Sequence, residues 1–337
     1  LGFSAFTKRH ASLPQLGAWH VVFYDGSMMK LLTLNVHAWL EVAQIPKIYA
    51  LAHEIIQRDV DVVCLQEVNQ FIESPIVDDV AGVAGGGLFV GDPQRPVRVD
   101  NYARILVEAL THYGAKPFYW TWDSTHLGFG HFDEGIAVLS RVPIAEVRRI
   151  DHCSAFADEY DNVRRRASIA VRLDGGEPVW VVSSHFSWWA DPAANPDEDP
   201  GFPIGMLPEG SDGLLFPHEW RQVSAACARL REESELPVVI AGDFNNAADV
   251  VSQGYELVMA DGCWSDSFLT AESVSGEATV HKKIHGWSDN TKALRIDYVF
   301  TSAGIAACKH EVVFADDSSS AVSDHSGIIV TLNSLPS

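Results

Sequence analysis

Side chains that can bind a metal ion or move a proton stand at the ends of apolar segments throughout the sequence. In the segment VVIAGDFNNAAD, residues 238–241 are apolar, and Asp243 and Asn245 follow almost at once. The complete set is Asn35, Glu67, His185, Asp243, Asn245, Asp297, Asp324 and His325. Each residue alone has an ordinary structural explanation, because Asp and Asn start turns after strands. Their repetition at strand ends along one chain instead predicts a site at one edge of a sheet.

Two residues of this set, Glu67 and Asp324, are carboxylates that could bind a metal ion. Carboxylate oxygens suit Mg²⁺ or Mn²⁺, which bind through a few protein carboxylates and complete their coordination with water and substrate phosphate. The sequence contains neither the GxxxxGK[ST] loop that cradles nucleotide phosphates nor the GxSxG turn that carries a nucleophilic serine. The set therefore predicts chemistry at a bound divalent cation.

Apolar periodicity predicts a chain in which strands and helices alternate with hairpins. Apolar runs predict strands over residues 30–39, 60–68, 118–126, 134–144, 164–189 (a hairpin around DGGEP), 238–241, 294–302 and 322–332. Helical spacing predicts helices over 45–59, 101–114 and 219–234, and Pro- and Gly-rich stretches predict surface insertions at 74–99 and 191–217. This mixture predicts an α/β protein in which two mixed sheets pack face to face with helices outside.

The composition restricts the domain organisation, the partners and the redox state of the chain. With 337 residues, 47% of them hydrophobic, we expect one domain over residues 28–337, preceded by an extension over residues 1–27. The formal net charge of -21 repels nucleic-acid backbones and anionic membranes, although bound cations can reverse the local field. Five cysteines without a CxxC pair predict reduced thiols in a cytoplasmic protein. No apolar run approaches the length of about 18 residues that would predict a membrane span.

Seven segments of the sequence stand in the order found in one known superfamily. They are LLTLNV, DVVCLQEV, EGIAVLSR, VVSSHFS, VIAGDFNN, RIDYVF and SDH. In these segments the chain resembles the endonuclease/exonuclease/phosphatase superfamily, which includes DNase I-like nucleases, apurinic endonucleases, neutral sphingomyelinases and sugar- or inositol-phosphate phosphatases. The resemblance covers about Met29 to Leu332. It implies a DNase I-like fold, a four-layer α/β/β/α sandwich with the site where the strand ends converge.

The resemblance also implies a metal site. Glu67 would be the principal Mg²⁺ ligand, with Asn35 beside it and Asp324 near the metal. One position departs from the pattern of apurinic endonucleases, which carry an acidic residue two positions after the first Asn. Here that position is His37, which disfavours a DNA-repair function and would alter any second metal position. His37 is also a candidate substrate contact, in the segment NVHAW.

The remaining residues of the set receive catalytic roles from the same resemblance. His325, paired with Asp297, would form a proton-transfer dyad, since an Asp fixes the tautomer of a His and stabilises its charged form. Asp243 would orient or deprotonate the attacking water, and the sequence leaves open whether Asp243 or His325 is the general base. His185 and Asn245 would hold the phosphoryl oxygens. Hydrolysis of this kind needs a positioned water and neutralised phosphoryl charge but no covalent nucleophile.

A closer resemblance lies in the variable segments around the implied site. NVHAW, LQEVNQ, THLGFGHFDEGIAVLS, SHFSWW and KKIHGWSDNTKALRIDYVF resemble the maltose 6'-phosphate phosphatases of Gram-positive bacteria. This resemblance implies a small phosphorylated substrate, a sugar phosphate, in preference to nucleic acid. Indole faces stack on sugar rings and on bases, so Trp188, Trp189 and Trp287 are candidate substrate contacts.

Alternatives remain at the level of single residues and of the whole chain. Trp120 and Trp122 fit a hydrophobic core as well as a site, and solvation explains Glu134 and Arg164–Arg166 at least as well as substrate contact does. An endo- or exonuclease with the same core is the main alternative function, which the acidic balance disfavours. A sphingomyelinase-like phosphodiesterase and a non-catalytic binding protein are further alternatives. The completeness of the residue set disfavours the last of these.

Overall fold

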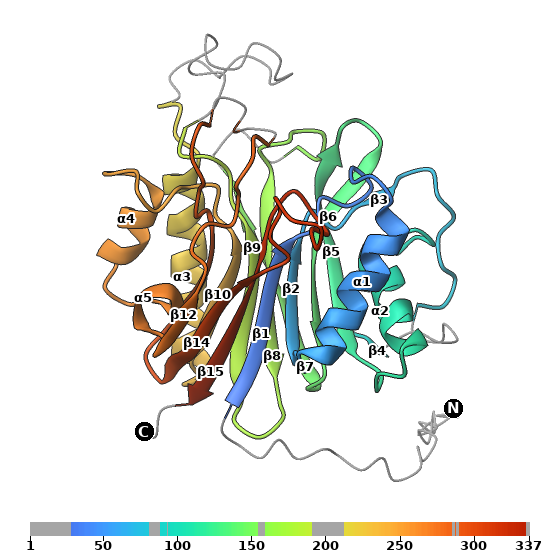
Figure 1. The fold of residues 1–337 in the computed structure, drawn as a ribbon, viewed down its shortest axis with the longest axis horizontal. Coiled ribbons are helices and arrows are strands. Elements are labelled where there is room, and N and C mark those ends of the chain that lie inside the picture. The colour runs from blue at the N-terminus through green and yellow to red at the C-terminus, as the bar shows by residue number, and fades with distance from the viewer. Residues whose placement is uncertain are drawn as a thin grey trace, which may run out of the picture.

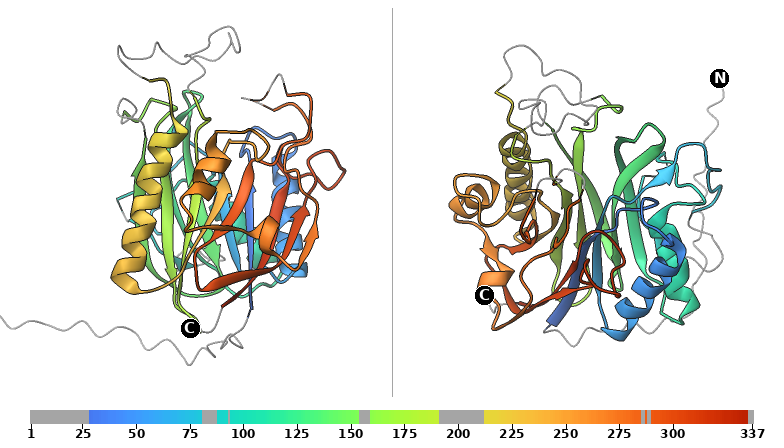
Figure 2. Two further views of the ribbon diagram at one scale, coloured as in Figure 1. Left: turned by 90° about the vertical axis from the view of Figure 1, so that its left-hand side faces the viewer. Right: turned by 45° about the horizontal axis from the view of Figure 1, so that its top comes forward.

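The computed structural model describes residues 28–80, 88–92, 94–153, 159–190, 212–284, 287 and 290–334. The extension over residues 1–27 and most of the expected insertion at 191–217 lie outside these residues. Within the described part, two β-sheets lie between two groups of helices (Figures 1 and 2). The predicted α/β/β/α sandwich of two mixed sheets is therefore confirmed.

The first sheet contains nine of the described strands. Its order is β12-β14-β15-β1-β2-β6-β5-β4, with β3 paired to β6. The strands are β1 (Met28–Asn35), β2 (Val62–Gln66), β3 (Gln70–Phe71), β4 (Leu88–Phe89), β5 (Tyr119–Gly128), β6 (Phe132–Ser140), β12 (Ser273–Ser275), β14 (Ile305–Val313) and β15 (Gly327–Ser334). The central strands β1 and β2 are parallel, and their carboxyl ends place Asn35 opposite Gln66.

The second sheet contains six of the described strands, in the order β11-β13-β10-β9-β8-β7. They are β7 (Ile144–His152), β8 (Arg166–Leu173), β9 (Val179–His185), β10 (Val238–Asp243), β11 (Ser265–Asp266) and β13 (Asp297–Thr301). Strands β9 and β10 are parallel and end together, which pairs Asp243 with His185. Strand β13 is antiparallel to β10 and begins at the same edge, which pairs Asp243 with Asp297.

Helices cover the outer faces of both sheets. Helices α1 (Gln44–Gln57) and α2 (Tyr102–His112) cover the first sheet (Figure 1). Helices α3 (Phe216–Ser234) and α4 (Gly254–Ala260) lie on the side of the second sheet. The short α5 (Ser267–Thr270) contacts β11 and β13 of the second sheet and β14 of the first. Helix α2 begins at a capping residue, since the Asn101 side chain accepts a hydrogen bond from the backbone N–H of Arg104. No described helix is long and apolar enough to cross a membrane.

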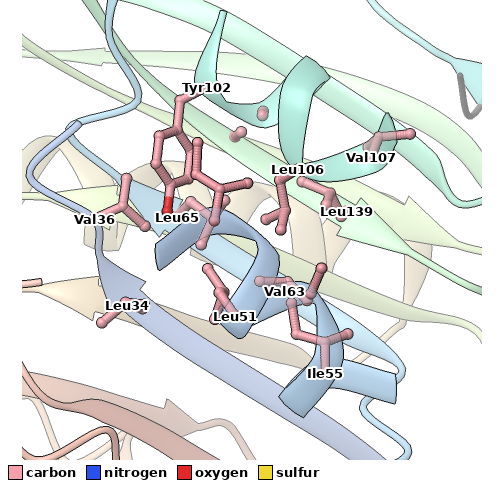
Figure 3. Close-up of a cluster of buried hydrophobic side chains, with 14 of the residues drawn as sticks. Leu34, Val36, Leu51, Ile55, Val63, Leu65, Tyr102, Leu106, Val107 and Leu139 are labelled. Atoms are coloured by element: carbon pink, nitrogen blue, oxygen red, sulfur yellow. The ribbon is translucent and has the colours of Figure 1, made fainter. Parts of the chain in front are cut away.

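Alternating side chains of the central strands enter different layers of the core. In β10, Val238 and Ile240 pack in the cluster beneath α3, whereas Val239 and Ala241 pack between the two sheets. By the same alternation, Leu34 of β1 and Val63 and Leu65 of β2 pack in the layer beneath α1 and α2 (Figure 3). Because both faces of these strands are buried, their sequences are mostly apolar. Trp120 and Trp122 are buried in this core, which confirms the structural alternative for both.

The structure corrects two of the expected strands. The expected strand over 322–332 begins only at Gly327, because residues 323–326 form a loop that crosses the end of β1, where the Ser323 hydroxyl donates to the Asn35 carbonyl at 2.7 Å. The single strand expected over 134–144 is divided between β6 and β7, which belong to different sheets.

Gly242 is required by the close approach of β10 and β9 at the end where the polar residues gather. Its φ of 152° lies where L-residues are strained, and a Cβ there would be 1.8 Å from the carbonyl oxygen of Ser184. Only glycine therefore allows the strand to deliver Asp243 in register with His185.

We expect Gly242→Ala to lower the free energy of unfolding by about 3 kcal/mol or more, because the new methyl group must displace backbone atoms of β9. Gly114→Ala is the matched control. Gly114 also has a positive φ, 80°, but an added Cβ would meet no atom within 4 Å, so we expect a loss of about 1 kcal/mol. Urea unfolding of both variants measures the difference, and equal losses would contradict the packing argument.

Candidate active site

The polar residues expected at strand ends converge on one pocket of about 610 Å³. The predicted site residues that line it, strand-end residues and substrate contacts together, are His37, Glu67, His185, Trp188, Asp243, Asn245, Asp324 and His325. Asn35 and Asp297 lie directly behind it, within hydrogen-bond distance of lining residues. The pocket stands at the edge where β1, β2, β9 and β10 end and β13 begins.

Asn35 connects the two sheets at the floor of the pocket. Its side-chain NH₂ group donates to Glu67 Oε1 at 2.8 Å and to Asp243 Oδ2 at 3.1 Å. Its Oδ1 accepts from the backbone N–H of His37 at 3.1 Å. One amide thus fixes the carboxylate of Glu67 from the first sheet relative to the carboxylate of Asp243 from the second.

His325 and Asp297 form a buried pair beside Asp243. His325 Nδ1 lies 2.9 Å from Asp297 Oδ2, and His325 Nε2 lies 3.7 Å from Asp243 Oδ2. The ring therefore has one nitrogen bound by Asp297 and presents the other to the pocket. Asp297 Oδ1 is buried and has no hydrogen-bond partner among the described residues.

His185 and Asn245 form the adjoining wall. Asn245 Nδ2 lies 3.2 Å from His185 Nε2 and donates to the Phe186 carbonyl at 3.0 Å. Trp287 Nε1 donates to Asn245 Oδ1 at 3.2 Å, so this indole touches the site through Asn245. Asn246 turns away, and its side chain donates to the Phe244 carbonyl within the loop.

The two neighbouring indoles after His185 have different places. Trp188 lines the pocket. Trp189 is partly buried against the core cluster that includes Phe216 and Trp220 and does not line this pocket. Adjacent residues of an extended segment point in opposite directions, so only one of the two can face the site. The structure therefore supports Trp188 rather than Trp189 as a pocket residue.

Three residues of the pocket wall were not expected there. Solvation was the preferred explanation for Glu134 and at least as good as phosphate binding for Arg166, but each is only 6% exposed and both line the pocket. His126, which the sequence did not single out, lines it as well. Arg166 Nη1 lies 3.6 Å from Glu134 Oε1, and His126 Nε2 lies 3.5 Å from the same oxygen. The available signals were the place of His126 and Glu134 in the segment THLGFGHFDEGIAVLS and the position of Glu134 before an apolar run.

Comparison with known proteins agrees with this geometry. The model of the Endonuclease/Exonuclease/phosphatase family matches residues 45–325. The chain belongs to this family. No curated protein gives a significant match to the chain. As a family member, the chain is a phosphoesterase.

Three similar solved structures share the fold over nearly their whole length. A family protein from Leptotrichia buccalis C-1013-b is 28% identical, with a TM-score of 0.68, covering 90% of this chain and 98% of that chain. A mannosyl-6-phosphatase from Bacteroides thetaiotaomicron VPI-5482 is 15% identical, with a TM-score of 0.57, covering 90% and 99%. The human Nocturnin catalytic domain is 13% identical, with a TM-score of 0.54, covering 92% and 94%.

The acidic side chains of this phosphoesterase site fit a divalent cation. Glu67 and Asp324 present carboxylate oxygens at the pocket, and these are the hard ligands that such ions prefer. Ligand atoms of His37, Glu41 and Asp324 also lie within 4.8 Å of one another. The set contains no soft thiolate ligand, so its chemistry favours Mg²⁺ or Mn²⁺ over metals that select sulfur.

The charges at the floor depend on burial and on near neighbours. Burial and the negative charge of Asp297 raise the pKa of Asp243 to about 7. Burial opposes the charged form of His325, but Asp297 and Asp243 hold the pKa of His325 well above its usual range. Burial likewise opposes the charge of His37, whereas the hydrogen bond to Glu41 and the charge of Glu67 raise its pKa to about 9.

In three further buried histidines the pKa is lowered instead of raised. Burial, reinforced by the positive charge of Arg166, lowers the pKa values of His126 and His185 well below the usual range and that of His152 to about 3. His152 lies behind the site, where its Nε2 is 2.8 Å from the Ser168 hydroxyl. These rings are therefore neutral in the folded protein at neutral pH.

His152 predicts a loss of stability on acidification. The pKa of His152 is lowered in the folded state, so below pH 6.5 the unfolded chain binds the proton more readily and stability falls as the pH decreases toward 3. One such group contributes a slope of at most about 1.4 kcal/mol per pH unit. Between pH 6 and pH 4, we expect His152→Gln to reduce the slope of the free energy of unfolding against pH by about 1.4 kcal/mol per pH unit. Urea unfolding at each pH measures this slope. An unchanged slope would contradict the neutral, buried state of His152.

Proposed function

We propose that this protein hydrolyses the phosphate monoester of a small sugar, of the maltose 6'-phosphate type, by direct attack of water. The observation that supports this proposal most strongly is the pocket itself. A volume of about 610 Å³ falls in the range of small-molecule sites, which is about 300–1,000 Å³. Its floor carries the catalytic set, and its rim includes Phe129 and Trp188, whose ring faces suit a sugar.

The charge of the chain and its relatives favour the same substrate class. A formal net charge of -21 opposes extended contact with a polyanionic nucleic acid. One of the structural neighbours is a mannosyl-6-phosphatase, and segments around the pocket resemble maltose 6'-phosphate phosphatases. A small sugar phosphate needs only one phosphoryl group to be neutralised, which a bound cation and two or three polar side chains can achieve.

A divalent cation, which we take to be Mg²⁺, would be held by Glu67 and Asp324 with Asn35 beside them. When bound, it supplies positive charge to the phosphoryl oxygens. Asn35 contributes by fixing the Glu67 carboxylate through its 2.8 Å hydrogen bond. Because Glu67 and Asp324 come from segments far apart in the sequence, the folded sheets must be complete before this site exists.

The side chains at the floor accept a proton from water, stabilise negative charge and bind the phosphoryl group. Asp243, whose pKa is raised to about 7, accepts a proton from the attacking water. His325 is held in its charged form by Asp297 and stabilises negative charge on the phosphoryl group. Asn245 and the neutral His185 would hold phosphoryl oxygens once the Asn245 amide exchanges its 3.2 Å contact with His185 Nε2 for the substrate, which frees an N–H on each side chain. A water oxygen forms the new bond to phosphorus as the bond to the sugar oxygen breaks. The sugar oxygen takes up a proton from solvent and leaves as the alcohol, and Asp243 returns its proton to solvent.

A substrate panel tests the proposed function. With Mg²⁺, we expect purified protein to release inorganic phosphate from maltose 6'-phosphate and related sugar phosphates, and to leave plasmid DNA intact. Phosphate release is measured colorimetrically, and DNA nicking by gel electrophoresis. Nicking of DNA without phosphate release from any sugar phosphate would instead support the nuclease alternative.

Substitution of Asp297 tests the role of the dyad. Asp297→Asn keeps the size of the side chain but removes the charge that stabilises protonated His325, so we expect kcat to fall by about 100-fold or more. Thermal unfolding checks that the fold survives. Retention of full kcat in a folded variant would contradict the role of the dyad.

Substitution of Glu67 tests the metal site separately from turnover. Glu67→Gln removes one carboxylate from the cation, so we expect Mg²⁺ affinity, measured by isothermal titration calorimetry, to fall by at least about 10-fold. Glu108→Gln is the control because Glu108 lies on α2 and pairs with Arg104, away from the pocket. Equal affinities in wild type and Glu67→Gln would refute the assignment of Glu67.

A further inference from the structure

The buried pair Glu134 and Arg166 joins the two sheets beside the catalytic floor. Glu134 belongs to β6 of the first sheet, and Arg166 begins β8 of the second. Arg166 Nη1 and Glu134 Oε1 are 3.6 Å apart, which is longer than a direct hydrogen bond. Both side chains line the pocket, so the guanidinium and the carboxylate are paired in charge while hydrogen-bonding capacity remains available.

The guanidinium of Arg166 is held in place from behind. Its Nε donates to the Ser187 hydroxyl at 3.2 Å. The backbone N–H of Ser187 in turn donates to Glu219 Oε2 at 2.8 Å, and Glu219 is fully buried in the first turn of α3. The planar group is therefore oriented before any substrate binds, which is how arginine binds polar groups with geometric selectivity.

His185 separates this pair from the reacting phosphoryl group. Its Nε2 lies 3.7 Å from Asp243 Oδ2, whereas its Nδ1, on the other side of the ring, lies 3.9 Å from Glu134 Oε1. Glu134 and Arg166 thus stand about one imidazole width away from the floor. Leu127 and Phe129 also line the pocket, which leaves space for the alcohol half of a phosphate ester.

We propose that Arg166 and Glu134 bind hydroxyl groups on the alcohol half of the substrate and select polyhydroxylated phosphate esters. This inference rests on the proposed function. A guanidinium only donates hydrogen bonds and a carboxylate only accepts them, whereas each sugar hydroxyl does both. Two neighbouring hydroxyls can therefore satisfy both charged groups at once. An ester without hydroxyls leaves the remaining hydrogen-bonding capacity of both groups unused in the pocket, which is a basis for discrimination.

A comparison of two leaving groups tests the role of Arg166. The substrates are maltose 6'-phosphate and 4-nitrophenyl phosphate, whose alcohol half has no sugar hydroxyls. For Arg166→Gln we expect kcat/KM to fall by about 10- to 100-fold on maltose 6'-phosphate and by less than about 3-fold on 4-nitrophenyl phosphate. Arg166→Lys keeps the charge but lacks the planar set of N–H donors of a guanidinium. We expect it to lower kcat/KM on maltose 6'-phosphate more than on 4-nitrophenyl phosphate, but by less than Arg166→Gln does.

The matched control is Arg165→Gln. Arg165 precedes Arg166 in the chain, but its guanidinium donates to the Thr125 carbonyl and does not line the pocket. We expect this variant to keep the wild-type ratio of the two kcat/KM values. Retained hydrolysis of 4-nitrophenyl phosphate by Arg166→Gln shows that the variant is folded and that its floor is intact.

A second measurement identifies the contact directly. Deoxy analogues of the sugar phosphate each lack one hydroxyl. Removal of a hydroxyl bound by Arg166 should lower kcat/KM in wild type by about 10-fold or more and have little further effect in Arg166→Gln, because the two changes remove the same interaction.

Two other results have separate meanings. An equal loss on both substrates would overturn the hydroxyl-binding subsite and place Arg166 at the phosphoryl group, while leaving sugar-phosphate hydrolysis in place. Wild-type protein that hydrolyses 4-nitrophenyl phosphate but no sugar phosphate would overturn the proposed function and the subsite together.

Discussion

Mutual repulsion among buried carboxylates is the constraint on which the site depends. Asp243 and Asp297 face each other across β10 and β13, and the charge of Asp297 raises the cost of ionising Asp243. Burial and the charge of Glu67 also oppose the ionisation of Glu134, whereas the positive charge of Arg166 favours it. The positive charges of His325 and Arg166, together with the amide of Asn35, offset part of this repulsion. The remainder favours a bound cation, which would be attracted to the excess negative charge.

The same constraint explains why the site lies between two sheets. Asn35 of β1 reaches Asp243 of β10 across 208 residues of sequence, and Arg166 of β8 reaches Glu134 of β6. Within one sheet the edge already places carboxylates together, as β10 and β13 do with Asp243 and Asp297. Packing two sheets brings donors from one to the acceptors of the other. The site is therefore a property of the interface between the sheets and not of any one segment.

Local patterning was sufficient to predict the fold class and the floor of the site. Apolar strands that end in polar residues show where buried backbone reaches an edge, and alternation places Asp243 and Asn245 together while Asn246 turns away. The wall was harder to predict because β6 is buried along its whole length, so alternation gives no indication that Glu134 faces a pocket. Glu134 and Arg166 come from different sheets, and their proximity depends on the angle of packing. Trp188 and Trp189 could not be told apart, since the turn after β9 decides which indole faces the pocket.

Backbone strain at the site connects its chemistry to the hydrophobic strands. His37, Glu67 and Asn245 have φ values of 44°, 51° and 49°, a region that costs non-glycine residues about 1–3 kcal/mol each. Two of these residues, Glu67 and Asn245, follow closely after strands whose residues are buried on both faces. Full burial of one aliphatic side chain contributes about 1.5–3 kcal/mol, so a few such residues in each strand can offset the strain that follows it. The apolar segments therefore do more than bring polar residues to an edge. They stabilise backbone conformations that would otherwise relax, and these conformations aim the side chains of Glu67 and Asn245 into the pocket.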